Sequence, residues 1–374
     1  MKALIVASYA DSLRNFRGPL VEALAGKLEA VHLAAPMDDG WNSLAEHFEA
    51  MGVELHDVAI QRTGLNPLRD LQALWQLYRL MRRERPQLML AYTVKPVIWG
   101  LLAAWLAGVP KRCALITGLG YAFTSGREGF TSYLVRFLYR LALSRAEKVF
   151  FQNPDDEALF KELHILPSST PSLVVNGSGI DLDQFAVAPK PAEPVFLLIA
   201  RLLGDKGVRE YVNAARKVKV AHPDTVFKLA GWIDENPNAI EQSELDSWID
   251  EGIVEYLGKL ADVRPALATS SVYVLPSYRE GTPRTVLEAM AMGRPIITTD
   301  APGCRETVVE GVNGYLVPVK SVDCLAGAML RFVEDSSLIE SMGRASRRIA
   351  EEKYDVHKIN EIMLTEMGVR TSAR

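Results

Sequence analysis

The stretch "SYREGTPRTVLEAMAMGRP" (277–295) places two carboxylates, Glu280 and Glu288, on either side of an expected helix start. The apolar run "VYVLPS" (272–277) just before it is typical of a buried strand. Unpaired N–H groups and the helix dipole favour an anion at a helix start, and a carboxylate there contributes ~0.3–1 kcal/mol. Two interpretations therefore stay open at this point. The acids tune the helix start, or they accept hydrogen bonds from the hydroxyl groups of a ligand.

The ends of this helix are marked by its flanking residues. Thr282 is a suitable N-cap, and Pro283 is a good first helical residue. Gly293 stands where a C-terminal cap is expected, and Pro295 prevents continuation. We therefore expect Glu280 in the loop at the carboxyl end of a strand and Glu288 in the second helical turn.

Two cations follow an earlier strand in the same half of the chain. The strand "VFLLIAR" (195–201) ends at Arg201, and Lys206 lies in the next loop, "LLGDKG". A forked guanidinium and a compact ammonium suit a diphosphate, although lone cations in loops are usually solvated. Two cations and two carboxylates on one edge of one sheet are better explained by a charged sugar nucleotide.

The elements that position these residues alternate between two periods. Short aliphatic runs at 3–7, 30–34, 53–59, 88–91 and 148–151 are separated by helical patterns. This alternation predicts βαβ units and a parallel sheet. The clearest helix spans 67–86, and its pattern places six apolar residues on one face: Leu68, Leu71, Leu74, Trp75, Tyr78 and Met81.

A proline-rich segment, "PKPAEP" (189–194), interrupts the alternation, and a second set of strands and helices follows it. The simplest fold is α/β, with two Rossmann-like, doubly wound parallel-sheet domains facing a central cleft. Ligands of such sheets bind beyond the carboxyl ends of the strands. We expect an N-terminal domain over 1–187 and a C-terminal, nucleotide-sugar-binding domain over 188–354.

Composition excludes several classes of protein. The net charge of −4 argues against a nucleic-acid binder that relies on bulk charge. Residues 1–150 carry 18 Lys and Arg against 13 Asp and Glu, whereas residues 151–374 carry 24 against 33. The basic first half is expected to meet something anionic. The apolar run 97–109 falls short of the ~20 residues that span a bilayer.

Cysteines and histidines show no metal-ligand spacing in the sequence, so we expect no bound metal and no cofactor. The histidines are His32, His47, His56, His164, His222 and His357, and we interpret them as structural or surface residues. Three cysteines and a start directly on a strand without a signal peptide favour the reducing cytoplasm.

The segment 130–145, "FTSYLVRFLYRLALSR", predicts a helix with an apolar side and arginines around another. With the arginines at 79, 82, 83 and 85, it would give the first half a basic face. Such a helix can lie on an anionic membrane surface. A core-packed helix with solvated charges is the alternative.

The sequence resembles family 4 of the retaining, GT-B-fold glycosyltransferases. The resemblance rests on "ARLLGDKG" (200–207), on the long match from 274 to 318 that contains Glu280 and Glu288, and on "VVNGSGIDLDQF" (174–185). The segments "NFRGPLVEAL" (15–24), "YTVKP" (92–96) and "TGLGYAFT" (117–124) look like the branch that extends undecaprenyl-diphosphate-linked saccharides. Within that branch the nearest resemblance is to α-1,3-N-acetylgalactosaminyltransferases that act on lipid-linked bacillosamine.

The resemblance implies roles for individual residues. Arg201 and Lys206 would bind the donor diphosphate, Glu280 the hydroxyl groups of the transferred sugar, and Glu288 the ribose. The donor-side set is completed by Gly231, Gly281, Thr282, Pro283 and Arg284, with Pro283 itself offering no N–H. The C-terminal helix 355–374 would pack back on the first domain.

On the acceptor side the sequence departs from the family twice. Many relatives have a Gly-Gly pair after the first strand, whereas here only Gly18 is present, and Arg14, Asn15 or Arg17 would compensate. Many also have a histidine where this chain has Tyr92, Thr93 and Lys95. Thr117 and Gly118 complete the expected acceptor set.

The function implied is retaining transfer of a sugar, expected to be an N-acetylhexosamine. The donor is a UDP-sugar and the acceptor an undecaprenyl-diphosphate-linked saccharide of bacterial glycan assembly such as O-antigen, capsule or glycoprotein glycan. The enzyme would be metal-independent and peripherally attached to the cytoplasmic face of the inner membrane. Two alternatives stay open: a sugar-nucleotide 2-epimerase of the same fold, and a non-catalytic nucleotide-sugar-binding protein.

Overall fold

The computed structural model describes residues 1–61, 64, 66–118, 130–191, 193–234 and 236–369, and these residues form two compact units. Unit 1 contains Met1–Ser178 and His357–Arg374, and unit 2 contains Gly179–Val356. The chain thus passes between the units twice, and its last helix belongs with the first residues. The boundary falls ahead of the 187/188 division expected from the sequence.

Unit 1 is built on a parallel sheet of seven strands in the order β3-β2-β1-β4-β5-β6-β7. Its strands are β1 (Lys2–Val6), β2 (Ala30–Ala35), β3 (Glu54–Asp57), β4 (Leu88–Tyr92), β5 (Lys111–Ile116), β6 (Lys148–Phe151) and β7 (Ser172–Val174). Its helices are α1 (Ala10–Ala25), α2 (Trp41–Glu49), α3 (Pro67–Glu84), α4 (Val94–Ala107), α6 (Phe130–Leu143), α7 (Pro154–Glu162) and α14 (Val356–Glu366).

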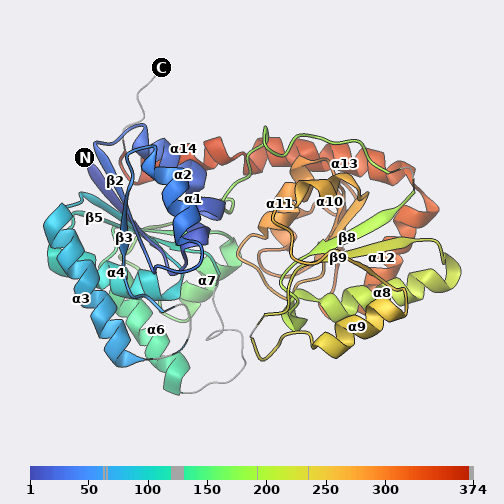
Figure 1. The fold of residues 1–374 in the computed structure, drawn as a ribbon, viewed down its shortest axis with the longest axis horizontal. Coiled ribbons are helices and arrows are strands. Elements are labelled where there is room, and N and C mark those ends of the chain that lie inside the picture. The colour runs from blue at the N-terminus through green and yellow to red at the C-terminus, as the bar shows by residue number, and fades with distance from the viewer. Residues whose placement is uncertain (62–63, 65, 119–129, 192, 235, 370–374) are drawn as a thin grey trace. The chain divides into compact units, whose positions relative to one another are not determined.

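Two apolar layers cover the faces of this sheet. One contains buried residues of α3, α4, α6 and α7, and the other those of α1, α2 and α14 (Figure 1). Burying both faces requires near-continuous apolar strands, which is why β1 and β4 show no alternation.

Unit 2 repeats the same strand order in six parallel strands, β10-β9-β8-β11-β12-β13. Its strands are β8 (Val195–Ile199), β9 (Val226–Ala230), β10 (Glu255–Tyr256), β11 (Val272–Leu275), β12 (Ile296–Thr299) and β13 (Gly314–Val317). Its helices are α8 (Val208–Ala221), α9 (Gln242–Asp250), α10 (Arg264–Ala268), α11 (Arg284–Ala291), α12 (Val322–Glu334) and α13 (Ser337–Ile349), with short helical turns η1 (Gly204–Lys206), η2 (Arg305–Thr307) and η3 (Ala350–Tyr354).

The predicted fold class is confirmed, and the apolar face predicted for α3 is only partly buried: Met81 is in the core, and Leu74 and Tyr78 pack against it. The helix begins as expected, with Pro67 in its first turn after the N-cap Asn66. Its buried stripe is Asp70, Ala73, Leu77, Leu80 and Met81. Leu68, Leu71 and Trp75 are instead 80, 61 and 58% exposed. The helix carries two apolar stripes, and sequence periodicity alone does not say which one packs on the sheet.

One buried ion pair joins α3 to α4. The Lys95 ammonium donates to the Asp70 carboxylate at 2.7 Å, and both side chains are about nine-tenths buried. Each charge is tolerated there because the other compensates it, so removing one partner leaves an unpaired charge in the core.

We expect Asp70→Leu to lower the free energy of unfolding by about 3–5 kcal/mol, the usual cost of breaking a buried pair. The double variant Asp70→Leu/Lys95→Met should regain most of that loss, because both charges are gone. Urea unfolding followed by circular dichroism measures both variants. Equal stability of the single variant and the wild type would show that the pair contributes nothing.

Candidate functional site in unit 2

The expected donor-side residues gather where the strand order of unit 2 reverses. Strands β8 and β11 are neighbours, yet the chain leaves them toward opposite ends of the sheet. Arg201 and Lys206 follow β8, and Glu280 and Glu288 follow β11. The crevice outside such a switch point is where doubly wound sheets bind their ligands.

The central contact of this edge joins Lys206 to Glu280. The ammonium nitrogen lies 2.5 Å from a carboxylate oxygen of Glu280, and the two side chains are 17 and 15% exposed. The predicted cation and the predicted acid are therefore direct partners. Their low exposure makes the pair more than a solvated surface contact.

Glycines let the surrounding backbones approach closely. Gly207 has φ +71°, and a Cβ atom there would lie 2.2 Å from the Pro276 carbonyl oxygen. Gly303 has φ +81°, and a Cβ atom there would lie 2.1 Å from the Glu280 carbonyl oxygen. The Glu280 N–H donates to the Pro302 carbonyl at 2.9 Å. Three loops are thus fixed against one another around Lys206 and Glu280.

Arg201 has a partner that the sequence analysis missed. Its guanidinium donates to Asp234 at 2.9 Å, and the two side chains are 34 and 20% exposed. Asp234 follows β9, which neighbours β8, so the strand order places it beside Arg201. Gly231 lies at the same place, where its Cβ would fall 1.8 Å from the Ala200 carbonyl oxygen. The next residue, Trp232, is 42% exposed.

The Glu288 carboxylate is almost fully buried rather than open to solvent. The residue is 6% exposed, and Arg284 one turn earlier donates to it at 2.9 Å. Burial raises the pKa of Glu288, and the Arg284 charge opposes that shift. Arg284 was expected near the donor through its backbone, whereas its side chain is the partner of Glu288.

The predicted start of α11 is one residue early. The helix begins at Arg284, with Pro283 as its N-cap, rather than at Pro283 after Thr282. The Pro283 carbonyl accepts a hydrogen bond from the Val286 N–H at 3.1 Å, so proline closes the first turn as an acceptor. The N–H that proline lacks is not needed at this position. Gly293 does follow the helix in the left-handed conformation at φ +75°, so that expectation is confirmed.

Burial and the negative charge of this edge raise the pKa of two buried side chains, Tyr273 and Cys304. The pKa of Tyr273 is raised by burial and further by the charges of Glu288 and Glu280. The pKa of Cys304 is raised to about 12 by burial and by Glu280, against the opposing charge of Lys206. Cys304 is therefore a neutral thiol. The charged groups of this edge are the carboxylates and their cationic partners.

At the equivalent switch point of unit 1, hydroxyl groups contact one another. The hydroxyl groups of Ser8, after β1, and Thr93, after β4, lie 3.0 Å apart. Ser12 and Tyr92 make a second hydroxyl contact at 2.8 Å, and the Arg17 guanidinium lies 5.3 Å from the centre of the Tyr92 ring. Thr93 has φ +68°, a rare value for a β-branched residue, and such strain is found at functional sites.

Most of the other residues expected to bind the acceptor lie in a helix or in a buried ion pair rather than in loops at the sheet edge. Gly18, Asn15 and Arg17 lie inside α1, so Gly18 has no loop backbone to offer a phosphate. Lys95 is held by Asp70 and is reached only by breaking that buried pair. Thr117 and Gly118 follow β5 at the carboxyl edge, and the rest of "TGLGYAFT" lies outside the described residues.

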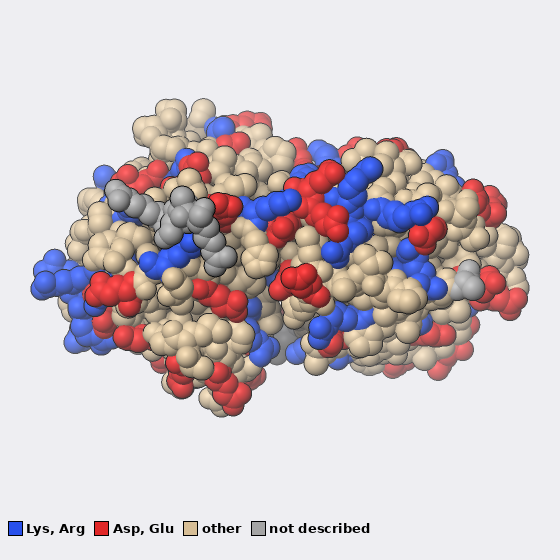
Figure 2. All heavy atoms as spheres, turned by 90° about the horizontal axis from the view of Figure 1, so that it is seen from above, with Lys and Arg blue, Asp and Glu red and all other residues tan. Residues whose placement is uncertain are grey.

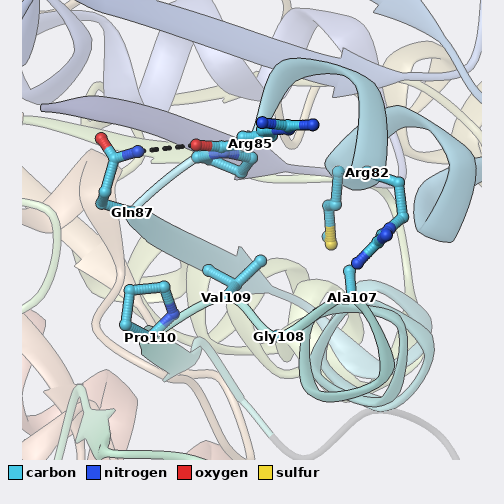
Figure 3. A pocket seen from close by; sticks show the side chains of 9 residues that line it. Arg82, Arg85, Gln87, Ala107, Gly108, Val109 and Pro110 are labelled. Carbon is cyan, nitrogen blue, oxygen red and sulfur yellow. Dashed lines mark hydrogen bonds between the residues drawn. The ribbon is translucent and has the colours of Figure 1, made fainter.

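A pocket of about 420 Å³ in unit 1 contains none of these residues. Arg82, Arg85, Gln87 and Pro110 are among its lining residues, and it opens at the amino ends of β4 and β5 (Figure 3). The Gln87 amide donates to the Arg85 carbonyl at 2.7 Å across one side of it. The carboxyl ends of α3 and α4 flank this pocket, and their dipoles disfavour an anion despite the arginines.

The unit 2 edge can therefore bind an anionic ligand that also carries hydroxyl groups. Two cations, each with its own carboxylate, can exchange that partner for phosphate oxygens. The freed carboxylates are then available as hydroxyl acceptors. Charge-assisted hydrogen bonds of this kind are stronger than neutral ones.

The raised pKa of Glu288 predicts a pH-dependent stability. A carboxyl with a higher pKa in the folded than in the unfolded protein costs stability as the pH rises from its ordinary pKa of 4.5 to the folded pKa. Glu288→Gln removes that cost. The free energy of unfolding of the variant, minus that of the wild type, should therefore increase as the pH rises through this window. The gain is at most about 1.4 kcal/mol per pH unit inside the window.

Urea unfolding between pH 4 and pH 8 measures this difference, with Glu334→Gln on the exposed side of α12 as the control. A difference between Glu288→Gln and the wild type that does not change with pH would contradict the burial argument.

Two family profiles match the chain. Residues 193–335 match the family described as "Glycosyl transferases group 1", and residues 8–153 match "Glycosyl transferase 4-like". The N,N'-diacetylbacillosaminyl-diphospho-undecaprenol alpha-1,3-N-acetylgalactosaminyltransferase of Campylobacter jejuni is 30% identical, over 87% of this chain and 88% of that one. The UDP-Gal:alpha-D-GlcNAc-diphosphoundecaprenol alpha-1,3-galactosyltransferase of Escherichia coli is 28% identical, over 74 and 73%.

Solved structures agree on the architecture. Anabaena HepE in complex with UDP gives a TM-score of 0.77 at 18% identity, over 99% of this chain and 100% of that one. The sucrose-phosphate synthase of Thermosynechococcus elongatus gives 0.77 at 16% identity, over 98% of both chains. With two doubly wound units, a charged edge at a switch point and these relatives, the chain belongs to glycosyltransferase family 4 and has the GT-B fold.

Proposed function

We propose that this glycosyltransferase moves an N-acetylhexosamine from a UDP-sugar to an undecaprenyl-diphosphate-linked saccharide during bacterial glycan assembly. The observation that carries the proposal is the Lys206–Glu280 pair at the switch point of unit 2. The names of the two curated relatives support the choice of acceptor, because both refer to undecaprenol diphosphate carriers.

The donor diphosphate would exchange places with the carboxylates at the unit 2 edge. Lys206 and Arg201 then bind phosphate oxygens, and Glu280 turns to the hydroxyl groups of the transferred sugar. Glu288, already fixed by Arg284, accepts from the ribose, and the backbone from Gly281 to Arg284 lies against the donor. The half-exposed Trp232 beside Gly231 offers a flat apolar surface for the base.

Retention at the anomeric carbon follows from attack on the face that the diphosphate leaves. The acceptor oxygen forms the new bond as the bond to the UDP oxygen breaks, and a phosphate oxygen of the leaving group takes the acceptor proton. Lys206 and Arg201 stabilise the charge that develops on the diphosphate. We propose that these cations do the work of a metal ion, so transfer is metal-independent.

The acceptor would bind at the unit 1 edge. The hydroxyl groups of Ser8, Thr93 and Ser12 offer donors and acceptors to a saccharide, and Arg17 lies beside Tyr92. Arg17 is 3% exposed, so it supports the edge from below rather than reaching into solvent.

We also propose that unit 1 attaches peripherally to the cytoplasmic face of the inner membrane through α3 and α6. The exposed stripe of α3 carries Leu68, Leu71 and Trp75 and then Arg79 and Arg82. On α6, Tyr133, Phe137 and Leu141 are 72, 53 and 38% exposed. Apolar side chains next to arginines suit an anionic lipid surface.

Other features of the molecule are compatible with that attachment. Among the helices of the described residues, none is long and apolar enough to cross a membrane. In the view of Figure 2, basic and acidic side chains are interspersed on each unit, so neither unit shows a single-sign surface there.

Lys206→Ala should reduce kcat by about 10²–10³-fold, the usual cost of removing one group that stabilises a leaving charge. Glu280 also loses Lys206 as its partner, so some stability is lost, and turnover is compared at a temperature well below the melting temperatures of both proteins. The assay measures UDP release and labelled sugar transfer for a panel of UDP-sugars, with and without an undecaprenyl-diphosphate-linked saccharide.

Lys217→Ala is the matched control, since Lys217 is an exposed lysine of α8 that pairs with Asp323. Turnover that needs no acceptor and yields an epimer or free sugar would contradict the transferase proposal. Binding of UDP-sugar without any turnover would point to a non-catalytic protein. Normal turnover by a folded Lys206→Ala variant would remove Lys206 from the mechanism.

Membrane attachment is tested with sedimentation of vesicles that contain anionic lipid. Arg79→Glu/Arg82→Glu should weaken binding about tenfold or more, because each basic residue near the surface contributes about 1 kcal/mol. The wild-type binding should also fall as salt is added. The control Lys27→Glu/Lys217→Glu makes the same charge change away from α3 and α6. Equal losses in both double variants would mean that overall charge, not this face, governs binding.

A further inference from the structure

The edge of the unit 1 sheet holds a cluster that the transfer reaction does not use. His32 on β2 pairs in register with Glu54 on β3, and His56 follows two residues after Glu54 on the same side of the strand. One ligand atom from each of the three residues lies within 4.8 Å of the others. His32 is 1% exposed, and Glu54 has a 60% exposed side chain. The cluster therefore runs from the core to the surface.

The distances in this cluster match the spacing of metal ligands. His32 Nδ1 lies 3.0 Å from His56 Nε2 and 3.5 Å from a Glu54 carboxylate oxygen. Ligands about 2.0–2.1 Å from a tetrahedral zinc ion are about 3.3 Å from one another. These two separations, 3.0 and 3.5 Å, bracket that value.

No placement of protons on the two neutral imidazoles satisfies every contact. If His32 Nδ1 carries its proton and donates to His56, then His56 is protonated on Nδ1, where the Arg83 N–H lies 3.4 Å away. Two donors then face each other. If His56 donates instead, the bare His32 Nδ1 faces the Glu54 carboxylate at 3.5 Å. A cation at the centre of the three atoms accepts lone pairs from His32 Nδ1, His56 Nε2 and the Glu54 carboxylate at once. The His56 Nδ1 proton then still faces Arg83, so the ion relieves the contacts among the three ligands and not that one.

Both signs of charge lie beside the cluster. The last turn of α3 lies against it, and a helix carboxyl end is the negative end of the dipole. Glu84 in that turn acts electrostatically on both histidines. The Arg83 guanidinium, which also contacts His56, pairs with Glu84, so the carboxylate offsets its charge.

We propose that His32, Glu54 and His56 form a binding site for a divalent transition-metal ion of the zinc class. Two imidazole nitrogens and one carboxylate oxygen are a donor set that suits zinc and disfavours calcium or magnesium. The ion fastens the edge strand β3 to β2. None of its three ligands is a residue that we propose to bind the donor or the acceptor, so we assign it a structural role.

The test measures zinc binding by the full chain after dialysis against a chelator. Zinc is titrated against a chromophoric competitor, bound metal is counted by elemental analysis, and the melting temperature is recorded. The wild type should bind one zinc per chain at micromolar concentration or below, and its melting temperature should rise. His56→Gln and Glu54→Gln should bind at least tenfold more weakly, the loss expected when a metal site loses a supporting group.

His47→Gln is the matched control, because His47 is an exposed histidine that contacts a single carboxylate, Glu22, at 3.3 Å. It should bind zinc as the wild type does. Cobalt added to the wild type gives an independent measurement, since a tetrahedral site produces an intense visible absorption. Absence of zinc binding by the wild type, or unchanged binding by His56→Gln and Glu54→Gln, would overturn the proposal. Transfer activity is not needed for any of these measurements.

Discussion

The contact between Lys206 and Glu280 is the constraint around which unit 2 is arranged. The two residues are 74 positions apart and meet because β8 and β11 are adjacent in a sheet whose order reverses between them. Gly207 and Gly303 keep the backbone of the neighbouring loops close enough to hold that contact. The loops that carry the two residues are therefore already in place, and a phosphate-bearing ligand would have to displace only the side-chain contact; a fixed backbone lowers the cost of binding.

The two units use the same strand order for different chemistry. The switch point of unit 2 is lined by paired charges, which suits a diphosphate. That of unit 1 is lined by hydroxyl groups around Ser8 and Thr93, which suits a saccharide. The left-handed backbone of Thr93 is held by its place between β4 and α4, which concentrates strain where the acceptor is proposed to bind. In the proposed reaction, the two similar edges would divide the donor and the acceptor between them.

Local sequence signals predicted the strands and helices well but not the faces they bury. The start of α3 at Pro67 and the left-handed Gly293 follow from properties of single residues, so the sequence was sufficient. The apolar face predicted for α3 is only partly the face that packs on the sheet, because a second apolar stripe lies beside it and only packing selects between them. Gly18 was expected near a phosphate because of its residue type, yet it lies within α1.

The sequence by itself determined the alternation of strands and helices and the placement of Arg201, Lys206, Glu280 and Glu288 after particular strands. Those features depend on short-range periodicity and on turn residues. Only the tertiary structure decided which charges meet: Asp234 with Arg201, Asp70 with Lys95, and His32 with Glu54 and His56. These contacts depend on strand order, register and helix packing, which are set by the whole core and leave no local pattern in the chain.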